Sequence, residues 1–210
     1  NIEMSLEIEN IQNIQNIQNY YDQRMVDINF LKTKNIDPYP HFYNKTHSIK
    51  ELCNYETQII SGEHKEDLII STSGRIILKR TSGKKLFFYT LEDNNYNIQI
   101  MASSLYYSND EPLSFTEINN IIHRGDIIGI NGFLGKSKKG ELSIFPKSIT
   151  LLTPCLHPLT KEHYGIQDID TRISKRYLDL QINKNTRNTF ITRSKIISFI
   201  RNYLNDQDFI

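Results

Sequence analysis

Cysteines and long apolar runs are scarce in this sequence, and each scarcity excludes a class of protein. The 210 residues include two cysteines, Cys53 and Cys155, with no His or Cys partner at metal-ligand spacing. We therefore expect free thiols, with neither a zinc site nor a disulfide framework. No segment has the roughly 18 consecutive apolar residues of a membrane-spanning helix, and the N-terminus lacks the basic start and apolar stretch of a secretory signal. These absences predict a cytoplasmic protein without a membrane partner, although an organellar location stays open.

Recognisable catalytic motifs are absent as well. The sequence has no phosphate-binding loop of the GxxxxGK[ST] type and no evident pair of nucleophile and base. We therefore assign no catalytic residue and no metal ligand, and we expect no cofactor bound by this chain.

Positive charge is unevenly distributed. The formal net charge is +1, yet residues 72–152 contain ten basic residues against seven acidic ones. Residues 1–19, by contrast, contain three acids and neither lysine nor arginine. The basic residues concentrate in KRTSGKK at 79–85 and KSKK at 136–139. Such clusters are typical of surfaces that contact a phosphate backbone, although solvated loop tips would give the same pattern.

The N-terminal region divides into an extension and a helix. Residues 1–19 are a low-complexity repeat of Ile, Gln and Asn, and its strict period of three predicts a disordered extension. Residues 20–71 are expected to hold a helix, ending before Asn35, and a connecting segment. The predicted apolar stripe of that helix comprises Ile17, Tyr21, Met25, Ile28 and Leu31.

Residues 72–153 carry the densest β pattern. The predicted strands fall within 71–80, 84–93, 97–101, 125–137 and 141–152, with a short helix at 115–123. Five strands and one short helix match a five-stranded OB-type barrel, whose sheet face and loops bind oligonucleotides. An SH3-like barrel or a small sandwich would also fit. The predicted fold class is mainly β with flanking helices (α+β).

The last quarter of the chain is predicted to be helical. Residues 154–167 read as a linker, and 168–210 as helices, the last with a buried apolar stripe of Phe190, Ile197, Ile200 and Leu204. Since this helix stands at the end of the sequence, we expect its apolar face to meet a partner chain or further sequence.

Alternation along two predicted strands places one aromatic residue on a polar face. Phe87, Tyr89 and Leu91 share one side, which is the core side, so Phe88 faces the other, near Gln99 of the next strand. A ring beside an amide suits an unpaired base, because the ring stacks and the amide hydrogen-bonds to the base edge. The alternative is that Phe88 packs under the N-terminal helix.

Several strings resemble one enzyme family. RGDIIG at 124–129, GELSIF at 140–145 and KRYLDL at 175–180, followed by NTRNTFITRSKII, are similar to the N-terminal half of class II lysine-tRNA ligases. The similarity begins near Tyr20 and continues to Ile210, with DPYPH and PCLHPL in matching order. The acidic repeat at 1–19 departs from the basic extension that eukaryotic members often carry.

The resemblance implies that the barrel binds a tRNA anticodon loop, that of tRNA-Lys. It assigns anticodon contacts to Arg80, Phe88, Gln99 and Glu141. The candidates for phosphate contacts are Lys84, Lys85, Lys136, Lys138 and Lys139.

The resemblance also implies a larger parent enzyme, which activates lysine with ATP and Mg²⁺ and transfers it to tRNA. The family's motifs 2 and 3 are absent here, so this chain is expected to be inactive alone. Its terminal helix resembles motif 1, which implies a homodimer. Two alternatives stay open, a non-catalytic single-stranded RNA-binding module and a fragment of an aspartate-type ligase.

Overall fold

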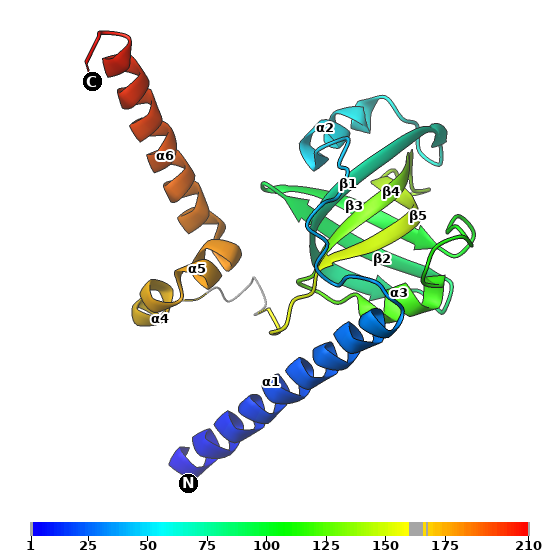
Figure 1. The fold of residues 1–210 in the computed structure, drawn as a ribbon, viewed down its shortest axis with the longest axis horizontal. Helices are drawn as coiled ribbons and strands as arrows, with labels where there is room; N and C mark the ends of the chain where they lie inside the picture. The colour runs from blue at the N-terminus through cyan, green and yellow to red at the C-terminus, as the bar shows by residue number, and fades with distance from the viewer. Residues whose placement is uncertain (1, 160–165, 167, 210) are drawn as a thin grey trace. The chain divides into compact units, whose positions relative to one another are not determined.

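The computed structural model describes residues 2–159, 166 and 168–209 (Figure 1). The chain forms two compact units, Asn1–Pro158 and Leu159–Ile210, each described here by itself. Residues 160–165 and 167 of the predicted linker lie outside the described residues. Among the helices that the structure describes, none is long and apolar enough to cross a membrane.

The first unit is a closed barrel of five strands with flanking helices, as predicted. The strands follow the order β1-β2-β3-β5-β4, and every neighbouring pair is antiparallel except β3 with β5. Its elements are α1 (Ile2–Thr33), α2 (Ile49–Cys53), the 3-10 helix η1 (Asn54–Thr57), β1 (His64–Thr81), β2 (Leu86–Asp93), β3 (Tyr96–Ser103), α3 (Phe115–Ile121), β4 (Ile127–Lys136) and β5 (Leu142–Thr153). The long β1 closes the barrel because its first part pairs with β4 and its last part with β2.

Turn residues determine where the strands end. Asn94 and Asn95 form the two-residue turn between β2 and β3, with φ of 50° and 71°, values that asparagine tolerates better than most residues. Gly83, with φ of 75°, turns the chain between β1 and β2. Pro146 lies in β5 where the register with β4 shifts, a position that suits proline because it has no N–H to donate to the ladder.

The barrel interior confirms the predicted alternation along β2 and β3. Phe87, Tyr89 and Leu91 are buried, as are Ile98 and Ile100. These side chains form one core cluster with apolar residues of β1, β4, β5 and α3. The neighbouring residues on both strands therefore face outward.

Helix α1 docks against the barrel through its C-terminal half, next to α3 in Figure 1. Ile28 and Leu31 of the predicted stripe are buried, whereas Ile17 is 45% exposed. Where disorder was expected over 1–19, the structure has helix from Ile2 onward. No glycine or proline interrupts this stretch, so a helix can propagate from the docked half.

An ion pair that was not predicted fixes α1 to the barrel. Arg24 is completely buried, and its Nη2 donates to both carboxylate oxygens of Asp126, at 3.0 and 2.9 Å. Its Nη1 donates to the carbonyl oxygen of Ile121, at the end of α3. Asp126 belongs to the Arg124-Gly125-Asp126 turn before β4, where Gly125 has φ of 98°.

The second unit consists of α4 (Ile169–Ser174), α5 (Arg176–Ile182) and α6 (Lys184–Asn205). Helices α4 and α5 are separated at Lys175, whose φ of −114° and ψ of 52° are not helical. This unit leaves the predicted stripe of α6 uncovered, since Phe190, Ile197 and Ile200 are 41%, 45% and 50% exposed. Leu204 is exposed as well, because the three helices are too few to enclose α6.

Candidate nucleic-acid interface

The outer face of β1, β2 and β3 carries the predicted contact residues in register. Arg80 of β1 lies opposite Phe88 of β2, which lies opposite Met101 of β3. The next row along the strands pairs Thr90 with Gln99. Residues opposite each other on neighbouring antiparallel strands point to the same side, so these side chains form one surface.

Phe88 is the aromatic residue of this surface. It is half-buried and lies outside the core cluster that contains Phe87 and Tyr89, so part of its ring is open to a ligand. Arg80, across the strand pair, is exposed and carries a planar guanidinium that binds phosphates or base edges. A stacking ring therefore stands beside a cation.

Gln99 and Glu141 are brought together by the parallel pairing of β3 and β5. The Gln99 Nε2 donates to Glu141 Oε2 at 2.6 Å, although the two residues are 42 positions apart in sequence. Ser143, which lies opposite Gln99 on β5, donates from its Oγ to Gln99 Oε1 at 2.9 Å. Gln99 and Ser143 are buried and Glu141 is exposed, so the network runs from the barrel wall to solvent.

Sequence reasoning missed Ser143, although its signal was present. Ser143 and Phe145 alternate along β5, and Glu141 directly precedes this strand with the same spacing, so all three lie on the outer side of the barrel. Next to them, His64, Tyr106 and Phe133 pack with Phe145 in an aromatic cluster, with ring centroids 4.2 to 5.8 Å from that of Phe145. This cluster extends the same outer surface toward β4 and β1.

The two lysine clusters lie near different parts of β3, one beyond its last residue and one beside Gln99 in its middle. The carbonyl oxygen of Lys85 accepts a hydrogen bond from Ser104, just beyond the last residue of β3. The tip that carries Lys136, Lys138 and Lys139 leads through Glu141 to Ser143, which lies beside Gln99. Gln99 and Ser104 are five steps apart, or about 17 Å in a strand, so the two clusters are at separate places beside the polar surface.

Lys79 differs from the other basic residues of KRTSGKK. Its Nζ donates to the carbonyl oxygens of Asn119 and Ile122, both at 2.6 Å, at the C-terminal end of α3. Burial lowers the pKa of Lys79 to about 8. This lysine stabilises α3 against the barrel and faces away from the candidate interface, unlike the exposed Lys84 and Lys85.

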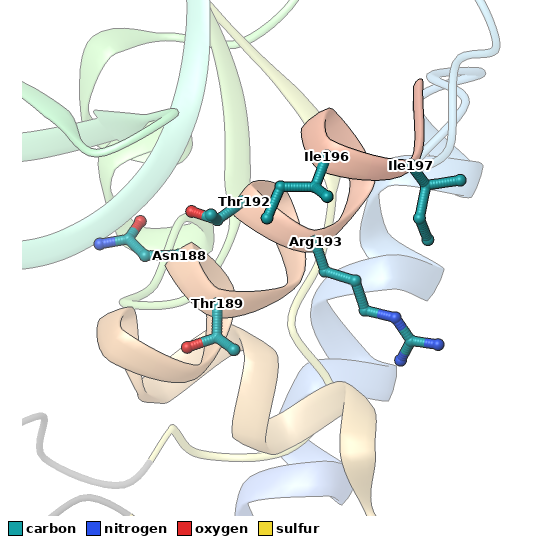
Figure 2. A pocket seen from close by; sticks show the side chains of 6 residues that line it. All are labelled: Asn188, Thr189, Thr192, Arg193, Ile196 and Ile197. Atoms are coloured by element: carbon teal, nitrogen blue, oxygen red, sulfur yellow. The ribbon is translucent and has the colours of Figure 1, made fainter. Parts of the chain in front are cut away.

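No described feature suggests a catalytic or metal site. Within 2–159, 166 and 168–209, no group of three or more His, Cys, Asp and Glu residues could hold a metal ion. Cys53 and Cys155 are free thiols. A hollow on the second unit is lined by Asn188, Thr189, Thr192, Arg193, Ile196 and Ile197 (Figure 2). All six belong to α6, so the hollow is the surface of one helix.

Models of two protein families match this chain, one in the barrel and one in the second unit. The model of the family described as "OB-fold nucleic acid binding domain" matches residues 70–152. The model of the family described as "tRNA synthetases class II (D, K and N)" matches residues 168–210. The first match spans β2 to β4 completely and includes all the predicted contact residues.

Curated relatives give the same assignment. The chain is 41% identical to "Lysine--tRNA ligase cla4" of Cladosporium cladosporioides, over 90% of this chain and 32% of that protein. It is 34% identical to "Probable lysine--tRNA ligase, cytoplasmic" of Vairimorpha ceranae (91% and 35%) and 36% identical to "Lysine--tRNA ligase" of Thermosipho melanesiensis (91% and 37%). The chain spans about a third of the length of these relatives. By sequence, the chain is therefore similar to the OB-fold domain and the start of the class II synthetase domain of lysine-tRNA ligases.

Proposed function

We propose that this chain is the anticodon-binding portion of a lysine-tRNA ligase. The observation that carries the proposal is the hydrogen-bonded pair Gln99 and Glu141, next to Phe88 on the outer face of an OB barrel. A ring, an amide and a carboxylate on one surface can stack one base and hydrogen-bond to the edge of another.

Each predicted contact residue has a chemical role in this proposal. Phe88 stacks on an unpaired anticodon base, and Gln99 with Glu141 offers a donor and an acceptor to a base edge. Arg80 binds a base or a phosphate beside the Phe88 ring. The lysines of both clusters hold the phosphates of the loop, and they add affinity without reading sequence.

The longer ligase would supply what this chain lacks. ATP and Mg²⁺ provide the activation of lysine in that enzyme, and we assign neither to the residues described here.

We propose that α6 forms a homodimer interface, a role supported by its exposed apolar residues. The relative from Vairimorpha ceranae is named as cytoplasmic, which supports the same compartment for this protein.

The stacking role is tested by Phe88→Ala. We expect the variant to bind a U-rich anticodon stem-loop about 5-fold to 100-fold more weakly, because a stacked base contributes about 1 to 3 kcal/mol. Fluorescence anisotropy with a labelled stem-loop measures the change.

Phe42→Ala is the matched control, since Phe42 is 78% exposed and lies in the segment before α2. It should bind like the wild type. Equal affinity of the Phe88→Ala variant and the wild type would contradict the proposal. Stem-loops with other anticodons distinguish a lysine ligase from an aspartate-type one, and equal binding of all single strands would favour a nonspecific RNA-binding module.

A further inference from the structure

The buried hydroxyl of Ser143 contacts the amide that is proposed to read a base. Ser143 lies opposite Gln99 in one of the two residue pairs that join β3 to β5, and its side chain is inaccessible to solvent. Its Oγ is 2.9 Å from Gln99 Oε1 and 3.0 Å from the carbonyl oxygen of Glu141. That carbonyl also accepts a hydrogen bond from the Ser137 N–H at 2.9 Å, so it keeps a partner when the hydroxyl donates its single hydrogen to Gln99.

The two neighbours of Gln99 distinguish the two ends of its amide. A carboxylate only accepts hydrogen bonds, so Glu141 Oε2, at 2.6 Å, requires the NH₂ end. A hydroxyl that donates requires the oxygen end, which is where Ser143 lies. Rotating the amide by 180° would turn its oxygen toward the Glu141 carboxylate and lose that hydrogen bond. The Ser143 hydroxyl would then have to turn its hydrogen away from Gln99 in order to accept from Nε2.

The fixed amide determines what a ligand meets. With Oε1 bonded to Ser143 and one Nε2 hydrogen bonded to Glu141, the second Nε2 hydrogen remains as a donor, next to the acceptor oxygens of Glu141. Uracil presents an acceptor, O4, beside a donor, N3–H, and so complements this order. Cytosine presents the reverse order, because its N4 amino group donates and its N3 accepts.

We propose that Ser143 is a positioning residue for base recognition, which fixes the Gln99 amide so that it donates to an acceptor on the base. The inference rests on the function proposed above, because it concerns the same surface. It adds a residue that makes no contact with RNA and that acts through Gln99. Ser143 therefore contributes to the distinction between uracil and cytosine more than to affinity as such.

The test compares two stem-loops that differ in one anticodon base, uracil or cytosine. For Ser143→Ala, we expect the Kd for the cytosine loop divided by the Kd for the uracil loop to fall about threefold to tenfold, because only the Glu141 hydrogen bond then holds the Gln99 amide in this orientation. Ser143→Thr keeps the hydroxyl and should keep the wild-type ratio. Ser148→Ala, which removes a hydroxyl elsewhere on β5, should also keep it.

Each outcome decides the proposal. A Ser143→Ala variant with an unchanged ratio, or with equal weakening toward both loops, would show a structural role only and overturn the inference while leaving the proposed function intact. A wild-type chain that binds neither loop would overturn both. If circular dichroism shows that Ser143→Ala is unfolded, Ser143→Cys replaces it, since a thiol of similar size donates weakly and should give an intermediate ratio.

Discussion

At the scale of single residues, Asp126 links α1, the end of α3 and the segment after β5. Its carboxylate accepts from Arg24 of α1, from the His123 N–H at 2.7 Å and from the Cys155 N–H at 2.6 Å. Burial raises the pKa of Asp126 to about 6, while Arg24 and the two N–H groups act in the opposite direction. The positive charge of Arg24 therefore keeps a buried carboxylate ionised near neutral pH.

We expect Arg24→Ala to destabilise the barrel unit by about 3 to 5 kcal/mol, because removing one partner leaves a buried charge uncompensated. Urea denaturation followed by tyrosine fluorescence measures the loss. Asp27→Asn is the control, since Asp27 also binds Arg24 but keeps 13% of its side chain exposed. A loss below about 1 kcal/mol for Arg24→Ala, comparable to an exposed pair, would show that the ion pair does not anchor α1.

The sequence predicted single residues where a local period decides their environment. Phe88 was separated from Phe87 and Tyr89 because strand alternation acts on neighbours. Arg24 was missed, since nothing in a helical stripe shows that an arginine will meet a carboxylate 102 residues away. Contact between Gln99 and Glu141 also depends on a long-range strand pairing, and only the family resemblance indicated it.

At the scale of elements, the strands were predicted better than the short helices. All five strands and α3 were expected from alternation and turn residues, whereas α2 and η1 were not. These two elements are five and four residues long, so they have too few turns to show a helical period. The early start of β1 at His64 was also missed, because its first part lacks the alternation of a half-buried strand.

The tip between β4 and β5 is the element whose charge can be tested separately. Changing Lys136, Lys138 and Lys139 together to Gln should weaken binding of every loop sequence alike, because phosphates carry no sequence information. The slope of log K against log salt should become shallower by up to about 2, at about 0.7 per phosphate contact.

Filter binding across a salt series gives this slope. Lys32→Gln, in the last turn of α1, is the matched control for the loss of a surface charge. A triple variant with the slope of the wild type would exclude these lysines as phosphate contacts.

At the scale of the whole molecule, the second unit presents an apolar helix face that its own residues do not cover. Phe199 is 71% exposed and Tyr203 58%, in addition to the predicted stripe. Monomeric proteins rarely expose so many large apolar residues on one element. This exposure is the structural basis for proposing an interface between two copies of α6.

We expect the chain to dimerise in solution and Ile197→Asp to weaken the dimer at least about tenfold, or ~1.4 kcal/mol, because a charge would be buried at the apolar face. Sedimentation velocity at several concentrations measures the dissociation constant. Ile169→Asp on α4, at a position that is 67% exposed, should leave it unchanged. A wild-type chain that stays monomeric at every concentration would contradict the proposed interface.

The parallel pairing of β3 with β5 limits which substitutions can change the base preference of this domain. Only two residue pairs, Gln99 with Ser143 and Ile100 with Ile144, close the barrel along this line. One pair belongs to the proposed reading network, and the other to the core. A substitution that altered base preference at Gln99 or Ser143 would therefore also loosen the closure of the barrel, so in this domain a change of specificity carries a cost in stability.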